Sequence, residues 1–119
     1  MKKIVVVDIG ISNILSIKNA LEFCGADVVV TNKKKVIEKS NKIVLPGVGA
    51  FQKGILNIKK LQLKNSLIKH CNDKNKFFLG ICLGMQLLFE KSFENGLFNG
   101  LGILKGSIKK LPKKNKILK

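Results

Sequence analysis

Several residue types are missing from this 119-residue chain, and each absence removes a class of function. Tryptophan and tyrosine are absent, which leaves few aromatic platforms on which single-stranded nucleic acid could stack. All 23 basic residues are lysine, so the chain lacks the arginine that most often reads base edges in DNA. No apolar run approaches the ~18 residues of a membrane span. We therefore expect neither a nucleic-acid partner nor a membrane partner.

Cysteine is scarce as well, and the spacing of the three cysteines fits neither disulfide bonds nor a metal site. Cys24, Cys71 and Cys82 are an odd number without paired spacing, which argues against a disulfide framework and against a zinc site. We expect Cys24 and Cys71 to be small apolar residues within or at the ends of helices. The short apolar run near the N-terminus is broken at Asp8, so it is not a signal peptide. We expect a cytoplasmic chain with no metal and no cofactor.

The formal net charge of +16 would ordinarily indicate an anionic partner. The lysines are scattered, however, with small clusters only at residues 33–35 and near the C-terminus, and asparagine is abundant. We interpret the excess as nucleotide bias in the gene, and a selected anion-binding surface is the alternative.

Apolar runs alternate with helical patterns along the whole chain. Strands are predicted at residues 4–7, 28–30, 43–45 and 77–81, with a late short strand around Ile108. Helices are predicted from Ile14 to the residue before Gly25, from near Ala50, from about Leu61 to Cys71, and from Leu83 through Phe89; residues 33–40 form a short polar helix or a loop. This alternation predicts a single α/β domain over residues 1–119, with a mostly parallel sheet and helices on both faces.

The functional groups of such a sheet gather at the carboxyl ends of its strands. Three predicted turns fall there, at residues 10–13, 46–49 and 80–84. In the first of them, Asp8 could orient the turn or be a solvated acid, and Asn13 is expected to cap the following helix.

The most informative turn contains Cys82 between Gly80 and Gly84, directly after an apolar strand and directly before an apolar helix. This is the layout of a nucleophile elbow, a sharp turn that holds one reactive side chain out of the backbone. A helix N-terminus favours the thiolate, and the N–H of Leu83 would face the oxygen of an attacked carbonyl. A buried structural cysteine between two packing glycines is the alternative interpretation.

The turn after the third strand contains Gly47, Val48 and Gly49. A glycine-flanked turn at this edge can direct backbone N–H groups at a developing oxyanion, although many such turns merely end a strand. The Walker lysine–serine pair of a phosphate loop is missing. Gln86, one turn after Cys82, could bind a substrate amide or satisfy local polar groups.

A cysteine nucleophile usually needs a base, and His70 is the only histidine. It ends the helix that leads into the 77–81 strand, whereas Cys82 follows the far end of that strand. Five residues at ~3.3 Å each separate the two by roughly 16 Å. We therefore expect His70 to be a surface residue rather than the base.

The stretch Gly80-Ile-Cys-Leu-Gly-Met-Gln-Leu-Leu-Phe89, with Leu45-Pro-Gly-Val-Gly-Ala-Phe51 upstream, resembles the class I, triad-type glutamine amidotransferases. Within them the chain looks most like the glutaminase subunits of imidazole glycerol phosphate synthase, of histidine biosynthesis. Segments 7–13 and 100–106 are similar to further family motifs, so the resemblance covers essentially all 119 residues.

The resemblance implies a flavodoxin-like fold and a role for each motif. Cys82 would take the γ-carbonyl of glutamine to a thioester and release ammonia. Leu83 and the Gly47–Val48 turn would form the oxyanion hole, the latter after a peptide flip, and Gly49 and Gln86 would hold glutamine. The ammonia would pass to a separate (β/α)₈ cyclase subunit.

Three departures from the family pattern affect these expectations. Ile9 replaces the usual tyrosine and Ser12 a glycine, which would stiffen the first turn. The family continues beyond this point to the catalytic histidine and glutamate, and no residue here matches either. We therefore expect an incomplete domain, either a fragment or a truncated product.

Other functions stay open beside this one. They are a catalytically inactive remnant that only binds a partner, an amidotransferase of a related sugar or cofactor pathway, and a charge-driven nucleic-acid-binding domain.

Overall fold

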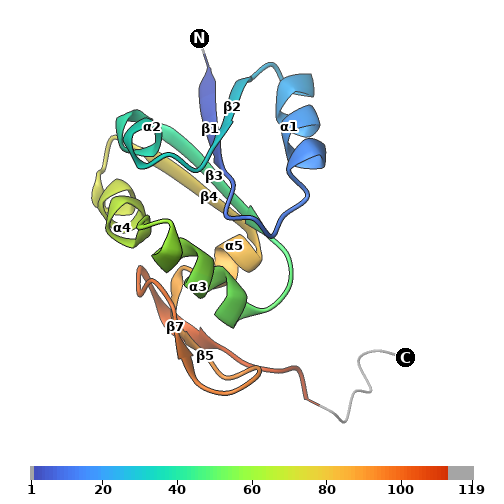
Figure 1. Ribbon diagram of the computed structural model, residues 1–119, viewed down its shortest axis with the longest axis vertical. Helices are drawn as coiled ribbons and strands as arrows, with labels where there is room; N and C mark the ends of the chain where they lie inside the picture. Colours follow the sequence, from blue (N-terminus) through green and yellow to red (C-terminus); the bar gives the residue numbers. More distant parts are fainter. Residues whose placement is uncertain (1, 113–119) are drawn as a thin grey trace.

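Four parallel strands form the main sheet of the computed structural model, which describes residues 2–112 (Figure 1). Their spatial order is β2 (Asp27–Thr31), β1 (Lys3–Val7), β3 (Lys42–Gly47) and β4 (Phe77–Cys82). All four predicted strands are confirmed, each within two residues of its predicted bounds. Short runs of β-branched and other apolar residues identified them because a central parallel strand is buried on both faces.

Helices cover the two faces of this sheet, as predicted (Figure 1). Helix α1 (Ile14–Phe23) lies on one face, and α2 (Lys34–Lys39), α3 (Phe51–Lys60) and α4 (Lys64–Asn72) lie on the other. The right-handed connections of a parallel sheet require this arrangement, because the chain steps from β1 outward to β2 and then back across β1 to β3. Among residues 2–112, no helix combines the length and the apolar character needed to cross a membrane.

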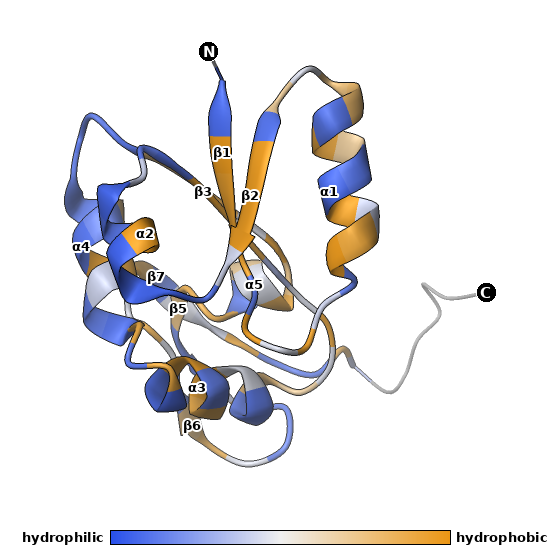
Figure 2. Cartoon of the chain, turned by 45° about the horizontal axis from the view of Figure 1, so that its top comes forward, coloured by the Kyte–Doolittle hydropathy of each residue, from blue (hydrophilic) through white to orange (hydrophobic). Residues whose placement is uncertain are grey.

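The hydrophobic core lies between the sheet and the α3–α4 layer. Val5, Val7, Ile43 and Leu45 alternate along β1 and β3 and point into it. The helices contribute apolar residues that are equally buried, namely Phe51, Ile55, Ile58, Leu63 and Leu67. In Figure 2 most of β1 and β2 is hydrophobic, whereas α2 and α4 consist largely of hydrophilic residues.

The predicted helix from Leu83 through Phe89 is wrong in its length. Helix α5 contains only Leu83–Gln86, and Phe89 begins a strand. The carbonyl oxygens of Leu87 and Leu88 accept backbone N–H groups from residues 101, 103 and 104, so they are not available to continue a helix. Backbone hydrogen bonds to a distant part of the chain thus take the place of the hydrogen bonds within a helix.

A small second sheet follows α5. It contains β5 (Phe89–Ser92), β6 (Phe98–Asn99) and β7 (Leu104–Ile108), in the order β6-β5-β7. Strand β6 is antiparallel and β7 parallel to β5. The late strand predicted around Ile108 is therefore confirmed as β7, whereas β5 and β6 were not predicted.

The prediction that His70 lies on the surface is wrong. Its side chain is only 3% exposed, and its Nε2–H donates to the carbonyl oxygen of Phe77 at 2.8 Å. The ring also packs edge-on against Phe78, with centroids 6.1 Å apart. Burial, the largest cause, lowers the pKa of His70 from 6.5, and nearby Lys76 lowers it further. His70 thus packs α4 onto the start of β4.

Candidate active site

Cys82 is the last residue of β4 and directly precedes α5. Its backbone has φ 54° and ψ −119°, a conformation that residues with a side chain rarely adopt. Such backbone costs on the order of 1–3 kcal/mol and persists only where the surrounding structure imposes it. The thiol is exposed. The sharp strand-to-helix turn predicted at this position is therefore present, with its side chain open to solvent.

The two glycines that flank Cys82 are needed for close packing. A Cβ atom on Gly80 would lie 2.7 Å from the Cα of Met85, inside the helix that follows the turn. A Cβ atom on Gly84 would overlap the carbonyl oxygen of Leu45. Glycine at both positions lets α5 lie directly against β3 and β4, and this packing imposes the strained backbone at Cys82.

The end of β3 lies beside the turn. Gly47 pairs in register with Cys82, and a Cβ on Gly47 would lie 3.3 Å from the Cβ of Leu83. Leu83 is the first residue of α5, so its N–H has no acceptor within the helix. The structure thus brings Gly47 and Leu83, two of the three predicted oxyanion-hole residues, beside Cys82, and the third, Val48, directly follows Gly47.

Val48, however, already uses its backbone donor. Its N–H donates to the carbonyl oxygen of Ile11 at 2.7 Å, which ties the loop after β3 to the loop after β1. These two loops flank the point where the chain reverses direction across the sheet, the usual site of ligand crevices in such folds. In this conformation the Val48 N–H is therefore not free to bind an oxyanion. Sequence reasoning missed this contact because Ile11 and Val48 are far apart in the chain.

The predicted substrate-binding residues come from the loop after β3 and from α5. Gly49 has φ 103°, is exposed, and has no atom within 4 Å of the position of a Cβ. Gln86 is the last residue of α5 and is half-buried. Open space at Gly49 and a partly accessible amide at Gln86 are compatible with binding a small polar substrate beside Cys82.

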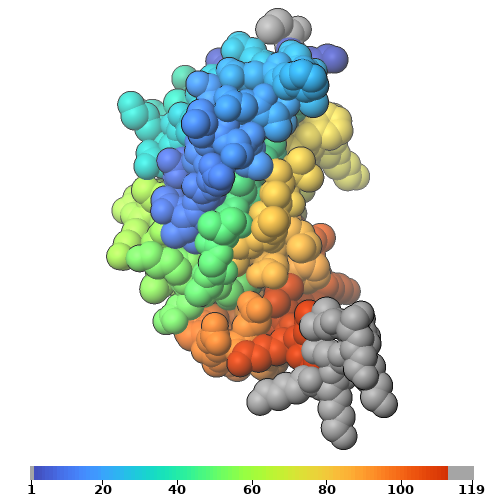
Figure 3. Space-filling view, turned by 90° about the vertical axis from the view of Figure 1, so that its right-hand side faces the viewer, coloured from blue at the N-terminus to red at the C-terminus, as the bar shows by residue number. Residues whose placement is uncertain are grey.

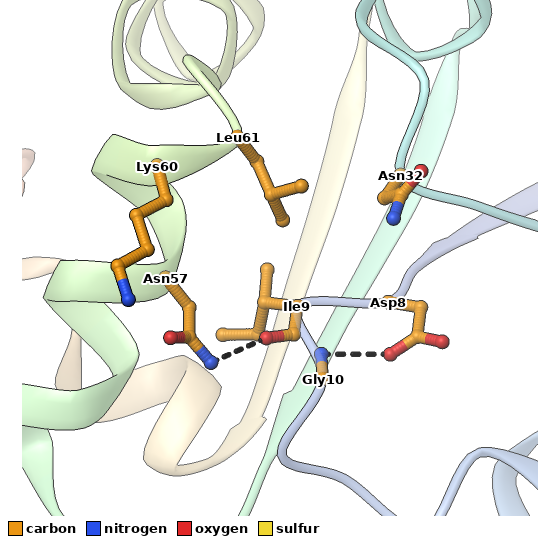
Figure 4. Close-up of a pocket in the computed structure, with 7 residues that line it drawn as sticks. All are labelled: Asp8, Ile9, Gly10, Asn32, Asn57, Lys60 and Leu61. Atoms are coloured by element: carbon orange, nitrogen blue, oxygen red, sulfur yellow. Dashed lines mark hydrogen bonds between the residues drawn. The ribbon is translucent and has the colours of Figure 1, made fainter.

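The first turn is held by polar contacts of its own (Figure 4). The Asp8 carboxylate accepts the Gly10 N–H at 2.8 Å, so Asp8 orients this turn. Asn57 of α3, which sequence reasoning missed, donates its side-chain N–H to the Ile9 carbonyl at 2.7 Å. Asn13 occupies the N-cap position of α1, but its side chain makes no capping hydrogen bond.

A cavity of about 240 Å³ opens beside this turn, and Figure 4 shows its lining. Its residues come from the ends of β1 and β2 and from α3: Asp8, Ile9, Gly10, Asn32, Asn57, Lys60 and Leu61. No residue of the Cys82 turn is among them, so this cavity is separate from the elbow.

His70 is too far from Cys82 to act as its base. It contacts Phe77, the first residue of β4, whereas Cys82 is the last. Five steps along a strand separate the two ends by roughly 16 Å. His70 is the only histidine of the sequence, so no imidazole of this chain can take a proton from the Cys82 thiol.

Comparisons with known proteins identify the family of this chain. A sequence model of the family described as "Glutamine amidotransferase class-I" matches residues 5–116. "Imidazole glycerol phosphate synthase subunit HisH" of Aquifex aeolicus (strain VF5) is 50% identical over 109 residues, which are 91% of this chain and 52% of that protein. The subunit of the same name from Caldanaerobacter subterraneus subsp. tengcongensis is 46% identical over 112 residues, 94% of this chain and 55% of that protein.

The chain thus spans about half the length of these curated relatives. Among solved structures, a peptidase E protein of Listeria monocytogenes EGD-e superposes with a TM-score of 0.69 at 14% identity, covering 87% of this chain and 63% of that one. At this identity the likeness shows the fold alone. The family match and the close relatives together show that the chain belongs to the class I glutamine amidotransferases.

Proposed function

We propose that this chain is the nucleophile-bearing part of the glutaminase subunit of an imidazole glycerol phosphate synthase. The single observation that carries the proposal is the exposed Cys82 at positive φ, with Gly47 and Leu83 beside it. The relatives at 46–50% identity, all described as that subunit, support the choice of pathway over sugar and cofactor pathways.

In the proposed reaction the Cys82 sulfur attacks the γ-carbonyl carbon of glutamine. The tetrahedral intermediate carries its negative charge on the former carbonyl oxygen. Its collapse breaks the carbon–nitrogen bond, leaves a thioester on Cys82, and releases ammonia once the leaving nitrogen has received a proton. Water then hydrolyses the thioester to glutamate and regenerates the thiol.

The oxyanion would be bound by the N–H of Leu83 and by a second N–H at the end of β3. Rotation of the Gly47–Val48 peptide would break the 2.7 Å hydrogen bond from Val48 to Ile11 and turn that donor toward Cys82. Losing this bond costs about 0.5–1.5 kcal/mol net, whereas one oxyanion donor is worth roughly 3–4 kcal/mol in the transition state. The rotation is therefore favourable once the charge develops.

Glutamine would be held by Gly49 and Gln86, on either side of the attacked carbonyl. The ammonia would pass to a (β/α)₈ cyclase subunit that uses it to build the imidazole ring. The base that activates Cys82 would come from outside the 119 residues, because His70 is at the other end of β4.

A chimeric subunit tests the proposal. In the A. aeolicus relative, the 109 matched residues are replaced by those of this chain, and glutamine hydrolysis is measured with the cyclase subunit of the same organism. We expect turnover that Cys82→Ala reduces at least ~10³-fold, and that Cys24→Ala, a change at an exposed thiol, leaves intact.

Two outcomes contradict the proposal. The first is a folded chimera that binds the cyclase but hydrolyses no glutamine, which would favour an inactive remnant. The second is hydrolysis that survives Cys82→Ala, which would assign the nucleophile to another residue.

A further inference from the structure

The cavity beside the first turn has polar side chains on two sides. Lys60 and Asn57 reach it from α3, and Asp8 and Asn32 reach it from the ends of β1 and β2 (Figure 4). Its volume of about 240 Å³ lies just below the roughly 300–1,000 Å³ of sites for drug-sized ligands, so it suits a smaller molecule. A hollow in which a few polar groups converge is the usual form of a ligand site.

Two of these polar groups are held in place and still have unused hydrogen-bonding capacity. The Asp8 carboxylate accepts the Gly10 N–H through Oδ1, and the Asn57 amide donates through Nδ2 to the Ile9 carbonyl. Among residues 2–112, no hydrogen bond engages Oδ2 of Asp8 or Oδ1 of Asn57. Acceptors that are already fixed can bind a hydroxyl group of a ligand at a small cost in conformational entropy.

Lysine residues surround the α3 side of the cavity. Lys60 lines the cavity itself, and Lys34, Lys59 and Lys64 line a second cavity of about 330 Å³. Both cavities lie between the end of α3 and the connection from β2 to α2. Lysine is usual in the last turn of a helix, so these charges alone do not indicate a site. Together with fixed acceptors across the same cavity, they indicate a ligand that is negatively charged at one end.

The two charged groups of the cavity are not paired with each other. Figure 4 shows the apolar side chains of Ile9 and Leu61 between Lys60 and Asp8, and no hydrogen bond joins the last two. A ligand can therefore contact both, with its anionic group at the ammonium and a donor at the carboxylate. Neutral amides share the cavity with Asp8, and amides exchange hydrogen bonds with hydroxyl groups, so hydroxyl donors fit better than a second cation.

We propose that this cavity binds a small organic anion that carries hydroxyl groups, with the anionic group at Lys60 and the hydroxyl groups at Asp8, Asn32 and the free amide oxygen of Asn57. Phosphate monoesters of polyols and hydroxycarboxylates share this chemistry. A phosphate group, with up to two negative charges, gains more from the neighbouring lysines than a carboxylate with one. No residue of the Cys82 turn lines the cavity, so this binding does not depend on the proposed function.

Calorimetric titration of the 119-residue chain tests the anionic end. The probes are glycerol 3-phosphate, glycerate and glycerol, at constant ionic strength. We expect glycerol 3-phosphate to bind 1:1 and Lys60→Gln to raise its Kd about tenfold, because a charge-assisted hydrogen bond is lost. Lys53→Gln is the matched control, since Lys53 is an exposed lysine of the same helix that lines neither cavity, and it should change the Kd less than about twofold.

Asp8→Asn tests the hydroxyl end. Asparagine can still accept the Gly10 N–H, so the turn is kept while the carboxylate charge is removed. The variant should bind glycerol 3-phosphate about threefold more weakly, yet bind inorganic phosphate at least as tightly as before, because a negative charge across the cavity is gone. Asn32→Ala, in the exposed loop after β2, should also weaken glycerol 3-phosphate and leave inorganic phosphate unchanged, and it replaces Asp8→Asn if that variant does not fold.

The preferred probe identifies the source of the ligand. Tighter binding of glycerol 3-phosphate supports the site and assigns it to a phosphate monoester, and tighter binding of glycerate supports the site and assigns it to a hydroxycarboxylate.

Three results would overturn the proposal. One is the absence of saturable binding by both anions. Another is equal weakening by Lys60→Gln and Lys53→Gln, which would show attraction to the overall charge of +16 rather than to a site. The third is glutamine that binds more tightly than either anion and depends on both Asp8 and Lys60, since the cavity would then hold an amino acid.

Discussion

At the scale of single residues, the strained backbone at Cys82 is the clearest sign of a functional constraint. Glycine would fit φ 54° and ψ −119° without cost, yet the chain has a cysteine there. The neighbouring glycines, Gly80 and Gly84, show that the local sequence uses glycine wherever packing demands it. A thiol kept at an unfavourable conformation indicates a role for the side chain itself.

This strain predicts an order of stability among variants of Cys82. Cys82→Gly should be more stable than Cys82→Ala by about 1–2 kcal/mol, because only glycine relieves the backbone while both variants lose the thiol. Urea unfolding of the two variants measures the difference. Equal stability, or a more stable alanine variant, would show that the turn is not strained.

His70 predicts how stability depends on pH. Burial lowers its pKa below 6.5 in the folded state, with Lys76 adding to and Asp73 opposing the effect, so the unfolded chain takes up a proton first as the pH falls. The contribution of His70 to the free energy of unfolding is therefore complete above about pH 6.5 and is lost progressively as the pH falls below it. We expect the free energy of unfolding to be smaller at pH 5.5 than at pH 7.5.

His70→Gln is the control for this dependence, since its amide can still donate to Phe77 while it does not titrate. The loss of stability between the two pH values should shrink in the variant. If both proteins lose the same free energy, other groups account for the effect.

At the scale of secondary-structure elements, two helices end in the same hydrogen-bonding pattern with different residues. After α1, Gly25 at φ 96° donates to Glu22, and Ala26 donates to Leu21. This is the Schellman arrangement, in which glycine is usual at the left-handed position.

After α3 the same arrangement holds Gln62 at φ 58°, with Gln62 donating to Lys59 and Leu63 to Ile58. Because glycine has no Cβ penalty there, Gln62→Gly should stabilise the fold by about 1 kcal/mol, and Gly25→Ala should destabilise it by about as much. Thermal unfolding of both variants tests the pair. If the two substitutions changed the Tm in the same direction, this account of the helix C-termini would be contradicted.

The elements differ in how far the sequence predicts them. The four strands of the main sheet and α1 follow from local apolar patterns, and so does the elbow, because glycines flank Cys82 between a strand and a helix. The end of α5 does not follow from a local pattern. The backbone carbonyls of Leu87 and Leu88 accept hydrogen bonds from residues about fifteen positions later in the chain, rather than from the next turn of a helix. The burial of His70 could have been predicted, because Leu63, Leu67 and His70 share one helical face.

At the scale of the whole molecule, the fold places the proposed nucleophile beside the proposed oxyanion turn and away from the only histidine of the sequence. The sheet places Cys82 beside Gly47, and it places the only histidine at the opposite end of β4. Strand β4, which ends at this cysteine and is the gold segment open to view in Figure 3, also exposes the apolar side chains of Phe77 and Leu79.

This predicts that the 119-residue chain alone hydrolyses glutamine negligibly, because its only histidine lies at the other end of β4 from the thiol. Ammonia release by the purified chain, compared with its Cys82→Ala variant, is the measurement. Steady turnover that the substitution abolishes would contradict the prediction and would require a base other than His70.

The central claim is that Cys82 is the nucleophile toward glutamine. Its most direct test exposes the chimera to a glutamine analogue with an electrophilic ketone in place of the carboxamide, and locates the adduct by peptide mass spectrometry. The account predicts one adduct, on Cys82, whose formation glutamine slows, while Cys24 stays unmodified although it is also exposed. Modification of Cys24 and Cys82 at similar rates, without protection by glutamine, would contradict it.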